Sequence, residues 1–194
     1  MKGIFIAWIA ILVSISCFGQ QKEAFKRKYV NHTEVGVLLG QVKYGGGYWG
    51  GESFMNRQTI TAQMYNGIQF DRSLSVGLTI GMDWYRSALM NPMALGIRYD
   101  ILKGKAARLY ASADAGYGFT WFNSNPEGYK TTGGLMLNPG IGIKFGKPDG
   151  AVATIGLGWR RQEAKVTKPP FVPETERVEK RVYNRLALRV GMSF

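Results

Sequence analysis

The chain has 194 residues, which suits one domain, and its 25 Lys and Arg against 13 Asp and Glu give a formal net charge of +12. No DNA-recognition helix or RNA-binding sheet motif accompanies this charge, so we expect no nucleic-acid partner. The 26 Gly, 10 Phe, 10 Tyr and 5 Trp with only 7 Pro indicate an all-β chain, and beyond the N-terminus no apolar stretch reaches the roughly 20 residues of a transmembrane helix.

The first 19 residues have the pattern of a secretory signal peptide. Lys2 precedes an apolar run from Ile4 to Ile15, and Cys17 and Gly19 are small residues at a cleavage position. We expect cleavage after Gly19, which would remove the only cysteine of the chain. Lipidation of Cys17 is the alternative.

From Thr33 onward, about eight segments alternate apolar and polar residues. In the segment from Ser73 to Trp84, every second residue from Leu74 is apolar, and the others are small or polar. Strict alternation is typical of a β-strand with two different faces. Eight such strands match the smallest outer-membrane barrels, so we expect 20–32 to be a periplasmic segment and 33–194 to form a barrel.

The composition of the polar face separates a membrane barrel from a soluble barrel of the lipocalin kind. Gly, Ser, Thr and Ala dominate this face, as expected of a narrow lumen, whereas a water-exposed surface would carry many long charged side chains. Aromatic residues gather near segment ends, as in the two girdles of a membrane barrel. These are Phe70, Trp84, Phe119, Trp121, Phe145, Trp159 and Phe194.

The connections between segments are expected to alternate in length. The longer ones are Lys43 to Asn56, Tyr85 to Asn91, Phe122 to Thr131 and Glu163 to Val182; the shorter ones are Asp71 to Arg72, Lys103 to Ala106 and Gly146 to Gly150. Outer-membrane barrels combine short periplasmic turns with longer external loops. This pattern predicts that both mature termini are periplasmic.

The C-terminal strand carries a resemblance to a known family. Leu188, Val190, Met192 and Phe194 alternate with small or charged residues up to a final aromatic, which resembles the closing strand that the barrel-assembly machinery reads. The chain is similar to small outer-membrane barrels of the OmpX or OmpA transmembrane-domain type. The resemblance implies an eight-stranded, antiparallel, up-and-down transmembrane β-barrel in the Gram-negative cell envelope, monomeric, with a structural or surface-interaction role. A narrow, porin-like channel or transporter for small solutes is the alternative, followed by a lipid-modifying barrel enzyme.

Charged residues on the polar face predict a network inside the lumen. The expected members are Glu34, Asp83, Arg98, Asp100, Arg108, Asp114, Lys144, Arg160 and Arg189, with Arg185 on the same face. Charges enclosed in a narrow barrel must be paired or solvated. We expect ion pairs that fill the barrel, and a polar solute path is the alternative.

Catalytic and cofactor sites are not indicated by the sequence. The single histidine, His32, precedes the expected first strand and is interpreted as a solvated residue. We therefore expect no enzyme activity, catalytic residue, cofactor or metal site, and an oxygen-ligand calcium site in the loops is the alternative for a metal.

Surface partners are predicted from the loops and the outer rim. Segment 44–56 is rich in Gly and aromatics and segment 163–182 in Pro and charges, so both are candidate contacts for an extracellular ligand. Cations near the outer rim would pair with lipopolysaccharide phosphates. These are Arg57, Arg86, Lys130 and Arg161.

Overall fold

The computed structural model describes residues 26–44, 53–85, 88–104, 107–122, 130–146, 150–168 and 177–194. Their strands are β1 (Lys28–Tyr44), β2 (Ser53–Gln69), β3 (Leu74–Tyr85), β4 (Ala88–Lys103), β5 (Ala107–Phe119), β6 (Lys130–Thr132), β7 (Gly134–Phe145), β8 (Val152–Lys168) and β9 (Arg177–Ser193). No helix within these ranges is long and apolar enough to cross a membrane.

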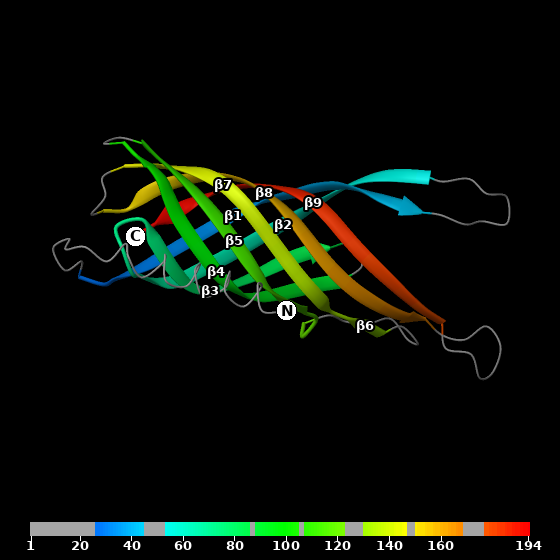
Figure 1. Ribbon diagram of the computed structural model, residues 1–194. Coiled ribbons are helices and arrows are strands. Elements are labelled where there is room, and N and C mark those ends of the chain that lie inside the picture. The colour runs from blue at the N-terminus through cyan, green and yellow to red at the C-terminus, as the bar shows by residue number, and fades with distance from the viewer. Residues whose placement is uncertain are drawn as a thin grey trace, which may run out of the picture.

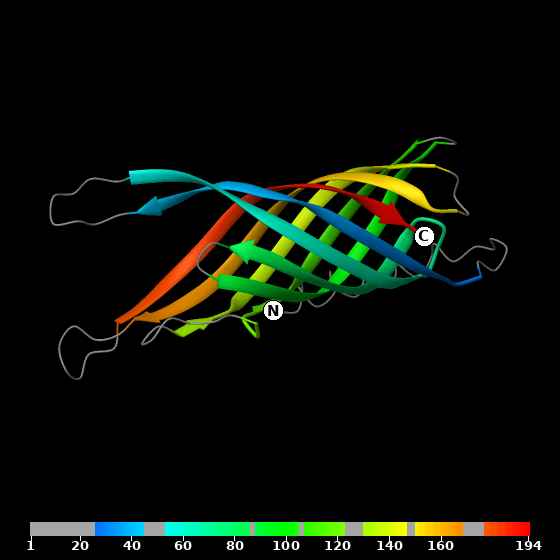
Figure 2. The same ribbon diagram turned by 180° about the vertical axis from the view of Figure 1, so that it is seen from behind.

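The strands form one closed antiparallel barrel (Figures 1 and 2). β6 and β7 are separated only by Gly133 and both pair with β8, so they act as one strand and the barrel has eight. β9 pairs with β8 and also with β1, where Val35 lies opposite Val190. This pairing confirms the predicted closure of the last strand onto the first, which leaves no open sheet edge along that stretch.

The two faces of the sheet are inverted relative to a soluble protein. In β3, Asp83 is 0% exposed whereas Trp84 beside it is 46% exposed, and the same alternation runs along the other strands. From Leu74 to Trp84, ten steps of about 3.3 Å on a strand tilted by about 40° span a height of about 25 Å. That height matches the apolar band of membrane barrels.

Exposed aromatic residues mark both edges of this band. We call the end that carries Lys28 and Phe194 the C-terminal mouth and the opposite end the far mouth. The aromatics at the C-terminal mouth are Tyr29, Phe70, Tyr99, Phe145 and Phe194, and those toward the far mouth are Trp84, Trp121, Phe122 and Trp159. Phe119 stacks on Trp121 with ring centroids 4.4 Å apart.

Several strands are longer than predicted. β1 begins at Lys28, inside the segment expected to precede the barrel, and the last connection shrinks from 163–182 to 169–176. The first shrinks to 45–52 and the third to 86–87, which is shorter than its neighbours, so the expected alternation of lengths is wrong at that point. Beyond the apolar band both faces of a strand are polar, and the backbone ladder continues without alternation. The β1–β2 and β8–β9 hairpins consequently project past the barrel at the far mouth (Figure 1).

Candidate functional site: the polar lumen

All ten charged residues predicted to face the lumen lie inside the barrel. We call this set the lumen network: Glu34 of β1, Asp83 of β3, Arg98 and Asp100 of β4, Arg108 and Asp114 of β5, Lys144 of β7, Arg160 of β8, and Arg185 and Arg189 of β9. Nine of them are buried, and the side chain of Arg108 is 14% exposed. The position of each follows from its parity in the strand, because every second side chain points inward.

A strut crosses the lumen between β8 and β3. Arg160 donates through Nη1 to Oδ2 of Asp83 at 2.7 Å, and both side chains are 0% exposed. Thr61 donates to the other oxygen of Asp83 at 2.6 Å. The second guanidinium nitrogen of Arg160 donates to Gln63 at 2.9 Å, and Gln63 donates to Glu34 at 2.7 Å. The strut therefore links four strands through hydrogen-bonded charges.

A second cluster is centred on Asp114. Arg98 approaches both carboxylate oxygens of Asp114, at 2.7 and 3.3 Å, in the bidentate arrangement that guanidinium favours. Thr79 and Asn138 each donate to the same carboxylate at 2.7 Å. Arg189 donates to the carbonyl oxygen of Asn138 at 2.8 Å. The side-chain amide of Asn138 thus connects Arg189 to the ion pair of Arg98 and Asp114.

A third cluster lies toward the C-terminal mouth. Asp100 accepts a hydrogen bond from Lys144 at 2.7 Å and lies 3.9 Å from a guanidinium nitrogen of Arg108. The ammonium group of Lys144 also lies 5.1 Å from the centroid of the Tyr110 ring. Tyr110 donates to Glu34 at 3.0 Å, so this ring connects the third cluster to the strut.

Apolar side chains fill the lumen toward the far mouth. This hydrophobic cluster consists of Leu38, Tyr85, Met90, Ala164 and Ala187, with the half-buried Tyr183 against it. Leu38 is an apolar residue on the otherwise polar lumen face of β1, and it is 0% exposed.

Arg185 donates to backbone carbonyl groups. Its Nη1 donates to the carbonyl oxygens of Gly40 at 3.0 Å and Arg57 at 2.6 Å. Carbonyl dipoles of two neighbouring strands therefore stabilise this buried cation.

The prediction for His32 is wrong. His32 lies within β1 and is 1% exposed, with its ring edge-on to Tyr65 at 5.6 Å and 6.0 Å from the Tyr110 ring. The backbone ladder between β1 and β2 runs through this residue and pairs His32 with Tyr65. Neither ring nitrogen has a hydrogen-bond partner among the described residues. No serine or carboxylate partner for catalysis is thus present at this histidine within those ranges.

The cations predicted at the outer rim are not equivalent. Lys130 is exposed, whereas Arg161 is partly exposed and pairs with Glu163 at 2.9 Å. Arg57 is half-buried on β2, and Arg86 lies outside the described residues. All three described residues lie toward the far mouth, on β2, β6 and β8.

The neutral members of the network were missed by sequence reasoning. Thr61, Gln63, Thr79 and Asn138 complete the hydrogen bonds of the charges, and Tyr65 and Tyr110 fill the space between them. Strand parity was the available signal. Thr79, Asn138 and Tyr110 each lie an even number of residues from a lumen charge on the same strand. Thr61, Gln63 and Tyr65 share one face of β2.

The fold is that of small outer-membrane barrels. No family model and no curated protein matches the sequence. The solid-state NMR structure of outer membrane protein AlkL in DMPC bilayers matches with a TM-score of 0.53 and 12% identity, covering 91% of this chain and 93% of AlkL. Neisserial surface protein A matches with 0.50 and 10%, covering 87% and 98%. OprG from Pseudomonas aeruginosa matches with 0.50 and 9%, covering 85% and 93%.

Proposed function

We propose that the chain is an integral outer-membrane barrel with a structural or surface-interaction role, a closed lumen and no catalytic activity. The observation that carries the proposal is the filling of the lumen by side chains. Its fully buried large residues include Arg160 and Arg185 within the lumen network and Leu38 and Met90 within the hydrophobic cluster. An eight-stranded barrel is just wide enough for side chains to fill.

The exterior of the barrel supports a membrane location. Its exposed apolar band, about 25 Å high and edged by aromatics, fits a lipid bilayer. We propose export to the outer membrane by signal peptide 1–19, which lies outside the described residues, with both mature termini facing the periplasm. The contact region for an extracellular ligand would then be the far mouth, where 44–56 and 163–182 combine projecting strand ends with loops outside the described ranges.

Single-channel conductance in planar bilayers tests the closed lumen. The refolded protein should produce no current steps, because ions would have to displace hydrogen-bonded charges and the hydrophobic cluster. Regular current steps at modest voltage would support the narrow channel for small solutes instead. A refolded porin inserted in the same bilayers controls for insertion.

Membrane fractionation tests the location. The protein should sediment with outer membranes and migrate on gels at different positions before and after boiling, because a closed barrel resists detergent until heated. A protein found wholly in the soluble periplasm would contradict the proposal.

We propose that rim cations pair with lipopolysaccharide phosphates. Lys130 is the best placed described residue, because it is exposed, while Arg161 must exchange Glu163 for a phosphate. Replacing Lys130 and Arg161 with alanine should lower the melting temperature in lipopolysaccharide-containing bilayers but not in phosphatidylcholine. Equal effects in both bilayers would count against the contact.

A further inference from the structure

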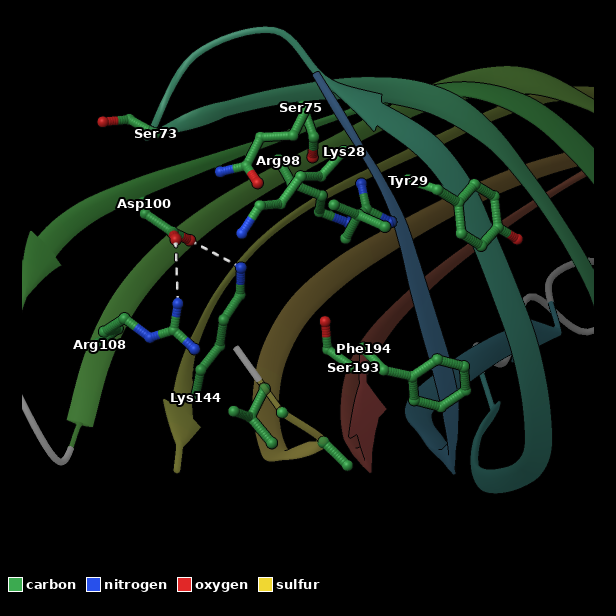
Figure 3. A pocket seen from close by; sticks show the side chains of 15 residues that line it. Lys28, Tyr29, Ser73, Ser75, Arg98, Asp100, Arg108, Lys144, Ser193 and Phe194 are labelled. Atoms are coloured by element: carbon green, nitrogen blue, oxygen red, sulfur yellow. Dashed lines mark hydrogen bonds and ion pairs between the residues drawn. The ribbon is translucent and has the colours of Figure 1, made fainter. Parts of the chain in front are cut away.

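A cavity of about 340 Å³ lies inside the C-terminal mouth. Figure 3 shows side chains that reach into it from different strands, with Lys28 from β1, Arg108 from β5 and Lys144 from β7. One water occupies about 30 Å³ in the liquid, so the cavity has room for a small ligand together with water. Its lining is polar on the inner side, where Ser75 and Ser193 add hydroxyl groups.

The charges that line this cavity are unbalanced. Among the lining residues that the structure describes, Lys28, Arg98, Arg108 and Lys144 are cations and Asp100 is the one acidic side chain. The carboxylate of Asp114 neutralises Arg98 from outside the cavity at 2.7 Å. In the third cluster, Arg108 and Lys144 therefore share the single carboxylate of Asp100, and Lys28 adds a further cationic side chain to the lining at the mouth.

Arg108 is the least satisfied of these cations. Among the described residues its guanidinium makes the 3.9 Å ion pair with Asp100 and no hydrogen bond, and its Nε is buried without a partner. Asp100 is already engaged at 2.7 Å by Lys144. Buried polar groups are normally hydrogen-bonded, and a guanidinium has five N–H donors. The side chain is therefore positioned for an acceptor with several oxygens that enters the cavity.

We propose that this cavity binds a phosphate group, with Arg108 as the main donor and Lys28 and Lys144 completing the positive surroundings. Phosphate has more than one negative charge and several oxygens, so it can accept from both Arg108 and Lys144, which share the one carboxylate of Asp100. The group comes either from free phosphate or from the headgroup of a lipid in the adjacent leaflet. The site depends only on the barrel and is independent of whether the lumen conducts.

Calorimetric titration of the folded barrel in a maltoside detergent tests the site. The two probes are inorganic phosphate and glycerol 3-phosphate, with glycerol as the uncharged control. Binding of inorganic phosphate would identify free phosphate as the source, and binding of glycerol 3-phosphate alone would identify the headgroup. Absence of heat with both probes would overturn the proposal.

Two variants locate the binding. Arg108→Gln should weaken binding about tenfold, because it removes charge-assisted hydrogen bonds from a mostly buried donor. Lys28→Gln should weaken it about threefold, because this side chain is exposed at the mouth. Lys165→Gln, which removes an exposed lysine on β8 toward the far mouth, is the matched control and should bind normally.

The outcomes separate a site from nonspecific attraction. Equal affinity of Lys28→Gln and Lys165→Gln, or an equal loss in both, would contradict binding at the C-terminal mouth. Heat-modifiable gel mobility checks that each variant is folded, and the two lysine variants decide the question if Arg108→Gln does not fold. A loss confined to the variants at the C-terminal mouth would support the site.

Discussion

At the scale of single residues, the pair of Asp83 and Arg160 should be the most sensitive charge interaction of the barrel. Asp83→Ala leaves the fully buried Arg160 without its carboxylate, and we expect a loss of about 3–5 kcal/mol of unfolding free energy. The double variant Asp83→Leu with Arg160→Met should lose less than the single variant, because no unpaired charge remains. Urea unfolding in lipid vesicles measures both.

The matched control is the ion pair of Arg161 and Glu163, which has similar geometry but side chains 40% and 38% exposed. Glu163→Ala should change the unfolding free energy by less than about 1 kcal/mol. Equal losses of unfolding free energy in Asp83→Ala and Glu163→Ala would show that solvent screens the lumen pair as strongly as the exposed pair, which would contradict a buried strut.

A side chain added at a lumen-facing glycine should destabilise the barrel where no space is available for it. A Cβ at Gly96 would lie 2.4 Å from Oδ1 of Asp114 and 2.9 Å from the hydroxyl of Thr79. Gly96→Ala should therefore destabilise the barrel by about 1–3 kcal/mol through overpacking. Gly150→Ala is the control, because a Cβ there meets nothing within 4 Å. Equal urea midpoints of the two variants would contradict this tight packing.

Sequence alternation predicts which face each lumen residue occupies, but not which residues meet. Arg160 and Asp83 are 77 positions apart, and their contact depends on the stagger between strands around the whole barrel. Parity on one strand contains no information about that stagger. The prediction for His32 fails for a related reason: its neighbours Asn31 and Thr33 on the other face of β1 are polar too, so the sequence shows no alternation there.

At the scale of elements, the last strand has two separable roles. Phe194 exchanges backbone hydrogen bonds with Asn31 at 2.7 and 3.0 Å, which complete the β9–β1 closure, while its ring is exposed at the C-terminal mouth. Phe194→Ala keeps the backbone bonds and removes the ring. The proposed assembly signal formed by Leu188, Val190, Met192 and Phe194 depends on side chains, and the closure depends on backbone.

We therefore expect Phe194→Ala to refold in detergent with nearly normal stability but to accumulate several-fold less in the outer membrane of cells. Trp84→Ala, which removes an exposed aromatic toward the far mouth, is the control and should assemble normally. Quantitative blotting of folded and unfolded forms measures assembly. A Phe194→Ala level equal to that of Trp84→Ala would argue against the signal.

At the scale of the whole molecule, the lumen has two barriers in series. The strut between Arg160 and Asp83 crosses the barrel at the level of Trp84 and Trp159, and the hydrophobic cluster with Leu38 and Tyr85 lies further toward the far mouth. The fold itself rests on the closed backbone ladder and on the apolar band, neither of which passes through the lumen. Opening the lumen should therefore be possible without unfolding the barrel.

Barriers in series make a specific prediction for conductance. Asp83→Ala with Arg160→Ala should stay silent in planar bilayers, because the hydrophobic cluster still excludes ions. Leu38→Ser with Tyr85→Ser should also stay silent, because the strut remains. All four substitutions together should allow current steps, with heat-modifiable mobility confirming the closed barrel. Current through either double variant would show that its remaining barrier does not seal the lumen, and silence of the fourfold variant would place a further barrier among the other buried cations, of which Arg185 and Arg189 are the candidates.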